Sequence, residues 1–290
     1  MTLTRNVQDA IAQTGLSELQ SSPRMPVLFL GHGSPMNAIE DTHYRQSWQR
    51  IGQELLAHVR PQMVLCISAH WITQGQGAWL TGMAQPRTIH DFGGFPDELF
   101  AQQYPAPGAP VVVKALAQEL HMPQSQQPLR VDEGEWGLDH GTWSVLKPMF
   151  PQADIPVVQL SLDYSLPAHE HFALGQQLRQ LRDRGVLIVG SGNVVHNLRA
   201  LRRTESSMQA YDWAIEFDQF VTDKVEQGDL RGLADFQQTG ALAQMAHPTY
   251  EHYLPVLYAA GAVQDGEQPQ FFNADFQMAS TSMRSMIWGA

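Results

Sequence analysis

The sequence contains a single cysteine, Cys66, among its 290 residues. An intrachain disulfide framework is therefore excluded. Cys66 lies between Leu65 and Ile67 in an apolar run, so we predict a buried and unreactive thiol. No stretch of about 18 apolar residues is present, which argues against a transmembrane helix. Residues 1–24 also lack the apolar core of a signal peptide. We therefore expect a cytoplasmic protein that does not bind membranes.

Positive charge is scarce as well. Lysine and arginine total 18 against 29 aspartates and glutamates, which gives a formal net charge of −11. Nucleic-acid binding needs clustered basic side chains, so we expect no nucleic-acid partner. The densest basic group, Arg199, Arg202 and Arg203, is interpreted as an exposed helix face. No Gly/Ser tract, charge block or internal repeat divides the chain, so we predict an N-terminal extension over 1–24 and one domain over 25–290.

Continuous apolar runs alternate along the chain with segments of helical periodicity. Val27–Leu30, Val64–Ser68, Val157–Leu162 and Val186–Val189 are predicted strands, and Tyr44–His58 is a predicted helix. Continuous apolar strands between helices are typical of a parallel sheet that is covered on both faces. We therefore predict a single α/β domain with a mainly parallel central sheet and helices on both faces.

Four histidines, His32, His70, His140 and His196, follow the ends of predicted strands. The strand before His140 is a further predicted one, Leu129–Val131. In an open α/β sheet the ligand crevice lies outside the carboxyl ends of the strands. Imidazole is a good ligand for zinc and for iron. Histidines from distant parts of the chain are therefore predicted to converge on one metal. Locally, His32 also fits a phosphate-cradling turn, and His70 fits a strand-end histidine bonded to a backbone carbonyl.

The remaining two of these histidines have informative neighbours. Asp139 precedes His140 and can accept its ring N–H or cap the following helix. His196 ends the loop Gly190–Asn197, which lacks the third glycine of a dinucleotide fingerprint. The same loop lacks a Gly-x-Ser-x-Gly elbow, so Ser191 is not expected to be a nucleophile.

A fifth histidine, His252, lies at the start of a predicted helix over Tyr250–Ala260, with Thr249 as its N-cap. Adjacent helical residues point about 100° apart, so only one of Glu251 and His252 can face a metal. A carboxylate at the start of a helix is explained by the positive helix end. This favours His252 as the ligand, with Glu251 as the alternative.

Six motifs together resemble the DODA-type extradiol aromatic ring-opening dioxygenases of the class III, LigB-like group. The similarity runs from about Pro26 to the C-terminus. The motifs are Gly31–Pro35, Ser68–Trp71, Thr88–Pro96, Gly137–Trp143, Gly190–Asn197 and His247–His252.

The resemblance implies extradiol cleavage of a catechol such as L-DOPA by O2, giving a hydroxymuconate semialdehyde. It implies a non-haem metal held by His32, His70 and His252. His196 would be a fourth ligand or the catalytic base, and His140 a second acid/base or substrate-orienting residue.

The loop over residues 85–108 is long for a compact domain, and such loops are more often functional than idle. Within it, His90, Phe92 and Phe95 are expected to cover the substrate ring. The alternative is a packed surface loop.

The sequence departs from the wider LigB-like pattern, which has a glutamate as the third ligand. An all-histidine set suits zinc as well as Fe(II). We expect Zn²⁺ as the bound ion and Fe²⁺ for dioxygenase activity. Two alternatives remain: a zinc hydrolase with Glu251 or Asp139 as general base, and a metal-binding protein with a vestigial site.

Overall fold

The computed structural model describes residues 15–202 and 209–290, and its main element is an eight-stranded sheet. The strands of the described part, including two that lie outside this sheet, are β1 (Val27–Gly31), β2 (Met63–Thr73), β3 (Trp79–Thr81), β4 (Arg130–Asp132), β5 (Val157–Asp163), β6 (Val186–Gly192), β7 (Pro269–Phe272), β8 (Phe276–Gln277), β9 (Thr281–Ser282) and β10 (Ser285–Trp288). Their order in the sheet is β4-β3-β5-β2-β6-β1-β10-β7, and β8 and β9 form a separate hairpin.

The centre of the sheet is parallel and its flanks are mixed. Strands β5, β2, β6 and β1 are parallel neighbours. On one flank β3 runs antiparallel to β5, and on the other β10 runs antiparallel to both β1 and β7. The predicted α/β class is confirmed. The parallel strands bring the carboxyl ends of β1, β2 and β6 to one edge of the sheet, as the predicted metal site requires.

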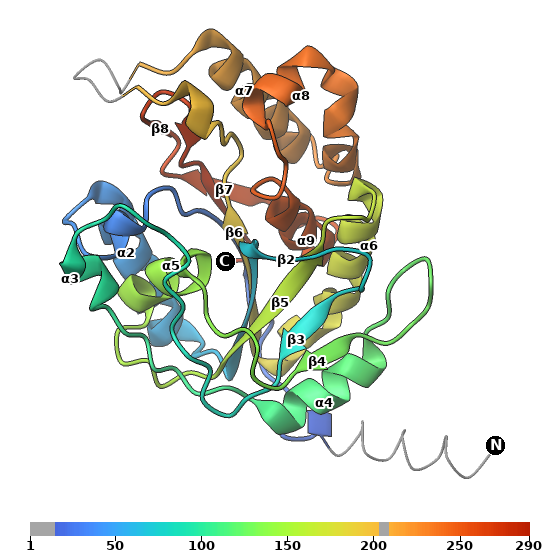
Figure 1. The fold of residues 1–290 in the computed structure, drawn as a ribbon. Helices are drawn as coiled ribbons and strands as arrows, with labels where there is room; N and C mark the ends of the chain where they lie inside the picture. The colour runs from blue at the N-terminus through green and yellow to red at the C-terminus, as the bar shows by residue number, and fades with distance from the viewer. Residues whose placement is uncertain (1–14, 203–208) are drawn as a thin grey trace.

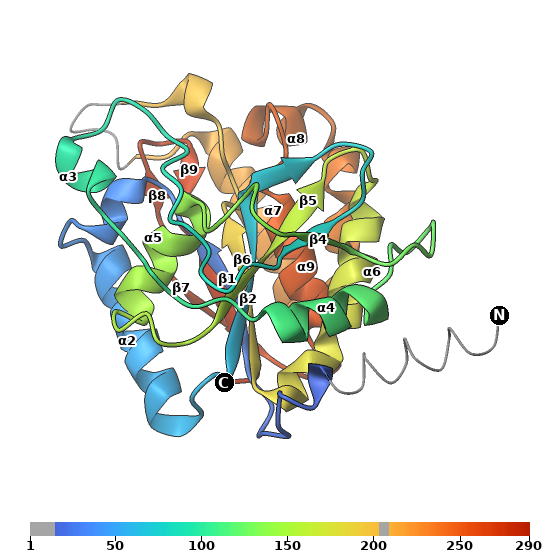
Figure 2. The same ribbon diagram turned by 60° about the horizontal axis from the view of Figure 1, so that its bottom comes forward.

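Helices cover both faces of the sheet. They are α2 (His43–His58), α3 (Asp97–Phe100), α4 (Pro110–Glu119), α5 (His140–Met149), α6 (Ala168–Leu178), α7 (Asp212–Glu226), α8 (Ala241–Ala246) and α9 (Leu254–Ala262), with 3-10 helices η1 (Pro35–Ala38), η2 (Arg179–Arg184), η3 (Leu198–Ala200) and η5 (Arg231–Thr239). Figures 1 and 2 show α2 and α5 on one side of the sheet and α6 and α9 on the other. None of the helices in the described part is long and apolar enough to cross a bilayer.

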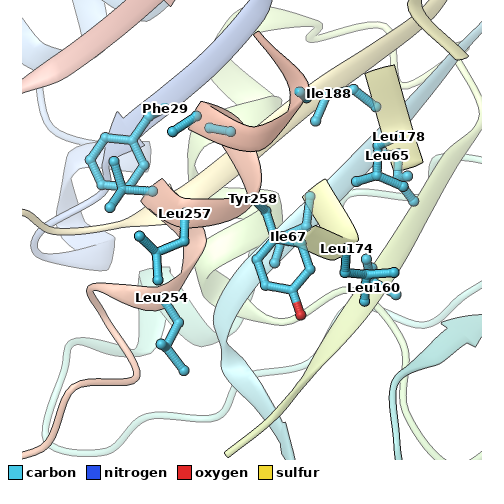
Figure 3. Close-up of a cluster of buried hydrophobic side chains, with 14 of the residues drawn as sticks. Phe29, Leu65, Ile67, Leu160, Leu174, Leu178, Ile188, Leu254, Leu257 and Tyr258 are labelled. Carbon is cyan, nitrogen blue, oxygen red and sulfur yellow. The ribbon is translucent and has the colours of Figure 1, made fainter. Parts of the chain in front are cut away.

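Alternate residues of the strands enter two separate cores. Leu28 of β1 packs in the core beneath α2 and α5, with Trp48 and Trp143. Its neighbour Phe29 faces the other core, where side chains of α6 and α9 such as Leu257 lie over the strands (Figure 3). Each fully buried apolar side chain of this size stabilises the fold by about 1.5–3 kcal/mol. Cys66 lies wholly inside the α2–α5 core, and burial raises the pKa of its thiol to about 12.

Two elements differ from the predicted ones at the sheet edge. Strand β2 continues past Ser68 to Thr73, so His70 lies within the strand and not after it. Helix α9 begins at Leu254 and not at Tyr250, and Tyr253 is its N-cap in place of Thr249. Both differences concern predicted metal ligands.

The N-terminal extension predicted over 1–24 lies partly outside the described residues, because residues 1–14 are not described. Of the described part, Leu16 and Leu19 are buried in the core beneath α6 and α9. The Arg24 guanidinium lies 2.8 Å from the Asp183 carboxylate. The boundary between extension and domain at residue 25 stays a prediction.

Candidate metal centre

Five histidines meet at the carboxyl edge of the parallel strands. His32 directly follows β1, and His70 lies on β2. His140 is the first residue of α5, His196 follows β6, and His252 lies in the turn before α9. All five line one cavity. The structure therefore brings together the five histidines that the sequence predicted as metal ligands or acid/base residues, from five separate segments.

Local backbone features orient two of these side chains, those of His32 and His70. Gly33 has a φ of +57°, which lets the chain turn sharply just after His32. The pairing of β2 with β5 shifts register between Ile67 and Ile72, so His70 lies on a bulge. Bulges often redirect a side chain next to a functional site.

His252 is held by its backbone and not by a helix. Its carbonyl accepts a hydrogen bond of 2.9 Å from the Asn193 N–H, just beyond β6. A Cβ on Gly192 would lie only 2.2 Å from the same carbonyl oxygen, so this approach requires glycine. The contact with the end of β6 explains why residues 251–253 form a turn where a helix was predicted.

Three of the histidines form a compact donor group. The Nε2 atoms of His32 and His70 lie 3.3 Å apart. One ring nitrogen each from His32, His70 and His252 lies within 4.8 Å of the others. Metal–imidazole bonds are about 2.0–2.1 Å long, so two such ligands of one ion lie about 3.0–3.4 Å apart. The observed spacing matches a shared metal.

The other ring nitrogen of each ligand has a partner on the protein. His32 Nδ1 lies 3.0 Å from Ser191 Oγ, and His252 Nδ1 lies 3.1 Å from Glu251 Oε1. His70 Nδ1 lies 3.3 Å from Asp91 Oδ2. The Asp91 and Glu251 carboxylates only accept hydrogen bonds, so they place the ring proton on Nδ1. Nε2 of each ring is then left with the lone pair that a metal requires.

Burial also keeps these rings neutral. The pKa values of His32, His70 and His252 are lowered well below the usual histidine value, first by burial and then by the neighbouring imidazoles. Neutral lone pairs that face one another without a proton between them are unfavourable. A cation at their centre removes that repulsion, so the residues present fit a divalent metal.

Asp91 links His70 to His140. Its Oδ2 lies 2.9 Å from His140 Nδ1, and its Oδ1 accepts the His140 backbone N–H at 2.9 Å. Burial raises the pKa of Asp91, but the hydrogen bond and charge of His140 outweigh burial and lower it to about 2. Asp91 is therefore an ionised bridge between the donor group and His140. It was missed from the sequence, although it directly follows His90 in one of the quoted motifs.

Asp139 has the role of a cap. Its side chain accepts the Thr142 backbone N–H at the start of α5 and the Ser68 hydroxyl at 2.7 Å. It also contacts the Gln159 amide. Burial raises its pKa to about 6. Of the two possibilities weighed for Asp139, the structure shows the helix cap; Asp91 is the carboxylate beside the His140 ring.

His196 lies parallel to His252. The two ring centroids are 3.5 Å apart with an interplanar angle of 11°. Burial lowers the pKa of His196 to about 3, with a smaller contribution from His247. A metal binds an imidazole close to the plane of its ring, so this parallel stacking disfavours one ion shared by both rings. A ring nitrogen each from His196 and His252 and a carboxylate oxygen of Glu251 nevertheless lie within 4.8 Å of one another. In the described part of the chain, no hydrogen bond engages the ring nitrogens of His196.

The cavity has a volume of about 1010 Å³ and an aromatic wall. Phe92 and Phe95 line it, and the Phe92 ring lies 5.4 Å from that of His140. His90 is not among the lining residues, because its Nε2 lies 2.9 Å from the Gln102 carbonyl. Two of the three residues expected to cover a substrate ring therefore lie on the cavity wall.

The structure also differs from the prediction made for the basic group Arg199, Arg202 and Arg203. Arg199 is exposed in the short 3-10 helix η3, and Arg203 lies outside the described residues. Arg202 lines the cavity. Arg202 lies outside any helix and lines the cavity, so the interpretation as an exposed helix face was wrong for this residue.

The chain is similar to known proteins over most of its length. The chain is 47% identical over 278 residues, 93% of its length and 97% of the relative's, to the 4,5-DOPA dioxygenase extradiol of Escherichia coli K12. It is 33% identical over 245 residues, 84% of its length and 89% of the relative's, to the protein of the same name from Beta vulgaris.

A crystal structure of an uncharacterized E. coli K12 protein superposes with a TM-score of 0.77 at 40% identity, covering 92% of this chain and all of that one. Residues 26–285 match the family described as the catalytic LigB subunit of aromatic ring-opening dioxygenase. The chain therefore belongs to the LigB family of aromatic ring-opening dioxygenases.

Proposed function

We propose that this protein is an extradiol dioxygenase that cleaves a catechol such as L-DOPA between C4 and C5. Both atoms of O2 enter the product, a hydroxymuconate semialdehyde. The single observation that carries the proposal is the inward-facing group of His32, His70 and His252 at the base of an aromatic-walled cavity. The relatives named 4,5-DOPA dioxygenase extradiol support the choice of substrate.

The same three histidines are the proposed metal ligands. Iron held there would supply a Lewis acid for the catechol oxygens and redox chemistry for O2. Zinc fits three neutral imidazoles equally well but cannot exchange electrons. We therefore propose that Fe²⁺ is the active ion and that Zn²⁺ occupies the site without supporting ring cleavage.

His196 is the proposed general base. Its ring lines the cavity, and its nitrogens have no hydrogen bond to the described residues. The parallel stacking on His252 argues against a fourth ligand in this arrangement. His196 therefore accepts a phenolic proton as the catechol binds.

His140 is the proposed second acid/base. Asp91 Oδ2 lies 2.9 Å from its Nδ1, and the His140 ring lines the cavity. Phe92 and Phe95 pack on the substrate ring and exclude water from it. Cytoplasmic location and the absence of nucleic-acid and membrane partners remain part of this proposal.

A zinc hydrolase is less well supported. Neither of its candidate bases lines the cavity: Glu251 lies against His252 Nδ1, and Asp139 caps α5. Among the described lining residues, Asp91 is the one carboxylate, and it already lies against two imidazoles.

The decisive experiment measures oxygen uptake and the appearance of yellow product with L-DOPA. The protein reconstituted with Fe²⁺ under anaerobic conditions is expected to consume one O2 per ring cleaved when air is admitted. Zinc-loaded protein is the control and is expected to be inactive. Absence of oxygen uptake with every catechol tested, together with zinc-dependent ester or amide hydrolysis, would favour the hydrolase.

A further inference from the structure

The cavity extends well beyond the space that a bare catechol needs. Its volume of about 1010 Å³ lies at the upper end of the range of roughly 300–1,000 Å³ for small-molecule sites. Besides the histidines, Leu198, Leu201 and Arg202 line it. The shape therefore leaves room for a substituent on the ring.

Arg202 is the one lysine or arginine among the described residues that line this cavity. Two other arginines of the fold, Arg182 and Arg284, form ion pairs with Glu267 and Asp218. Within residues 15–202 and 209–290, no ion pair joins Arg202 to a carboxylate.

The position of Arg202 is fixed by two contacts. The guanidinium carbon lies 4.0 Å from the centroid of the Tyr211 ring. The Arg202 backbone N–H donates to the Met278 carbonyl at 3.0 Å, and the Tyr211 N–H donates to the Ala279 carbonyl at 3.2 Å. One turn of the β8–β9 hairpin therefore anchors both the cation and the ring beneath it.

That turn is strained. Met278 and Ala279 have φ angles of +51° and +67°, although neither is glycine. Non-glycine residues in this region are destabilising and persist where the surrounding structure enforces them. Met278 also lines the cavity. The fold thus maintains an unfavourable turn at the place where Arg202 is held.

We propose that Arg202 binds the carboxylate of a catechol with an acidic side chain, while the diol lies at the histidines. The proposal rests on the proposed function for the catechol itself. Guanidinium groups bind carboxylates through paired N–H···O bonds. In a chain with a net charge of −11, an anionic substrate also needs a local cation at its binding site. Leu198 and Leu201 supply apolar surface for the carbons between ring and carboxylate.

The test compares L-DOPA with its methyl ester, which masks the carboxylate and keeps the amine. Affinities are measured by calorimetry on zinc-loaded protein without oxygen, so that no turnover is involved. Wild type is expected to bind L-DOPA about 10- to 100-fold more tightly than the ester. Arg202→Gln, which retains an amide to lie over Tyr211, is expected to abolish this preference and to leave affinity for the ester unchanged.

Arg199→Gln is the matched control, because it removes the same charge from an exposed neighbour that does not line the cavity. It is expected to keep the wild-type preference. An Arg202→Gln protein with the wild-type preference, or a wild type that binds acid and ester equally, overturns the proposal. The preference for L-DOPA over its ester can depend on Arg202 while iron-loaded wild type cleaves no catechol. In that case the proposed function fails and the carboxylate subsite stands.

Discussion

Ser191 determines which ring nitrogen of His32 carries the proton. Its Oγ lies 3.0 Å from His32 Nδ1 and donates its own hydrogen to the Gly141 carbonyl. Because the hydroxyl has one hydrogen and gives it to the carbonyl, it can only accept from the imidazole. His32 therefore carries its proton on Nδ1, and its Nε2 is free to bind a metal.

Replacing Ser191 by alanine is expected to weaken metal binding about 10- to 100-fold while the fold is retained. The physical reason is the loss of the group that selects the His32 tautomer. Competition with a chelator of known affinity measures the effect. Ser144→Ala is the control, since Ser144 is a buried serine of α5 whose hydroxyl has no hydrogen-bond partner among the described residues. Equal affinities in the two variants would argue against the tautomer role.

The two candidates for the third ligand, Glu251 and His252, lead to opposite expectations for the metal content of their variants. His252→Ala is expected to reduce bound metal to a small fraction, because a ligand is removed. Glu251→Gln keeps an oxygen that can accept from His252 Nδ1, so it is expected to retain most of the metal. Elemental analysis after dialysis distinguishes them. Loss of metal from Glu251→Gln with retention in His252→Ala would make Glu251 the ligand.

His196→Ala is expected to bind iron normally and to lose about 10²- to 10⁴-fold in kcat, as for removal of a general base. The measurement pairs metal content with product formation from L-DOPA. His247→Ala is not a suitable control, because His247 is buried and contacts the Val194 carbonyl. His58→Ala, on the exposed end of α2, is expected to change neither quantity. An iron-depleted His196→Ala protein would point to a fourth ligand.

Metal-free protein is expected to lose stability as the pH falls below about 6.5. Burial lowers the pKa of six histidines in the folded state. Below the unfolded pKa the unfolded chain then binds more protons, which favours unfolding by up to about 1.4 kcal/mol per pH unit for each group. Urea unfolding between pH 8 and pH 5 measures the slope.

One of these histidines isolates the effect away from the metal site. His171 lies beside the Tyr258 hydroxyl in the α6–α9 core, and burial lowers its pKa to about 4. His171→Gln is expected to make the free energy of unfolding depend less steeply on pH, by the contribution of one proton. His58→Gln is expected to leave this slope unchanged. A wild-type unfolding free energy that is flat over this range would contradict the assignment of neutral buried imidazoles.

Much of the site could be predicted because its histidines follow recognisable strands. His32 and His196 directly follow buried apolar runs that end at one edge of the sheet. His252 was predicted as a ligand candidate but in the wrong element. Its turn depends on the contact between its carbonyl and the Asn193 N–H, which joins residues 59 positions apart and leaves no local pattern.

The partners of the ligands could not be predicted for the same reason. Ser191 and His32 are 159 residues apart, and Asp91 and His140 are 49 apart. The bulge that carries His70 depends on how β2 and β5 pair, which no single strand sequence specifies. Arg202 was assigned to a helix face because its role depends on a hairpin turn near residue 278.

The donor group joins residues 32, 70 and 252, and this spacing constrains when the protein can acquire its metal. The site lacks a ligand until residue 252 has left the ribosome and the turn before α9 has docked on the end of β6. A nascent chain that stops earlier offers two imidazoles at most from this group. Metal acquisition is therefore a late event in biosynthesis, and it marks a chain whose sheet has already assembled.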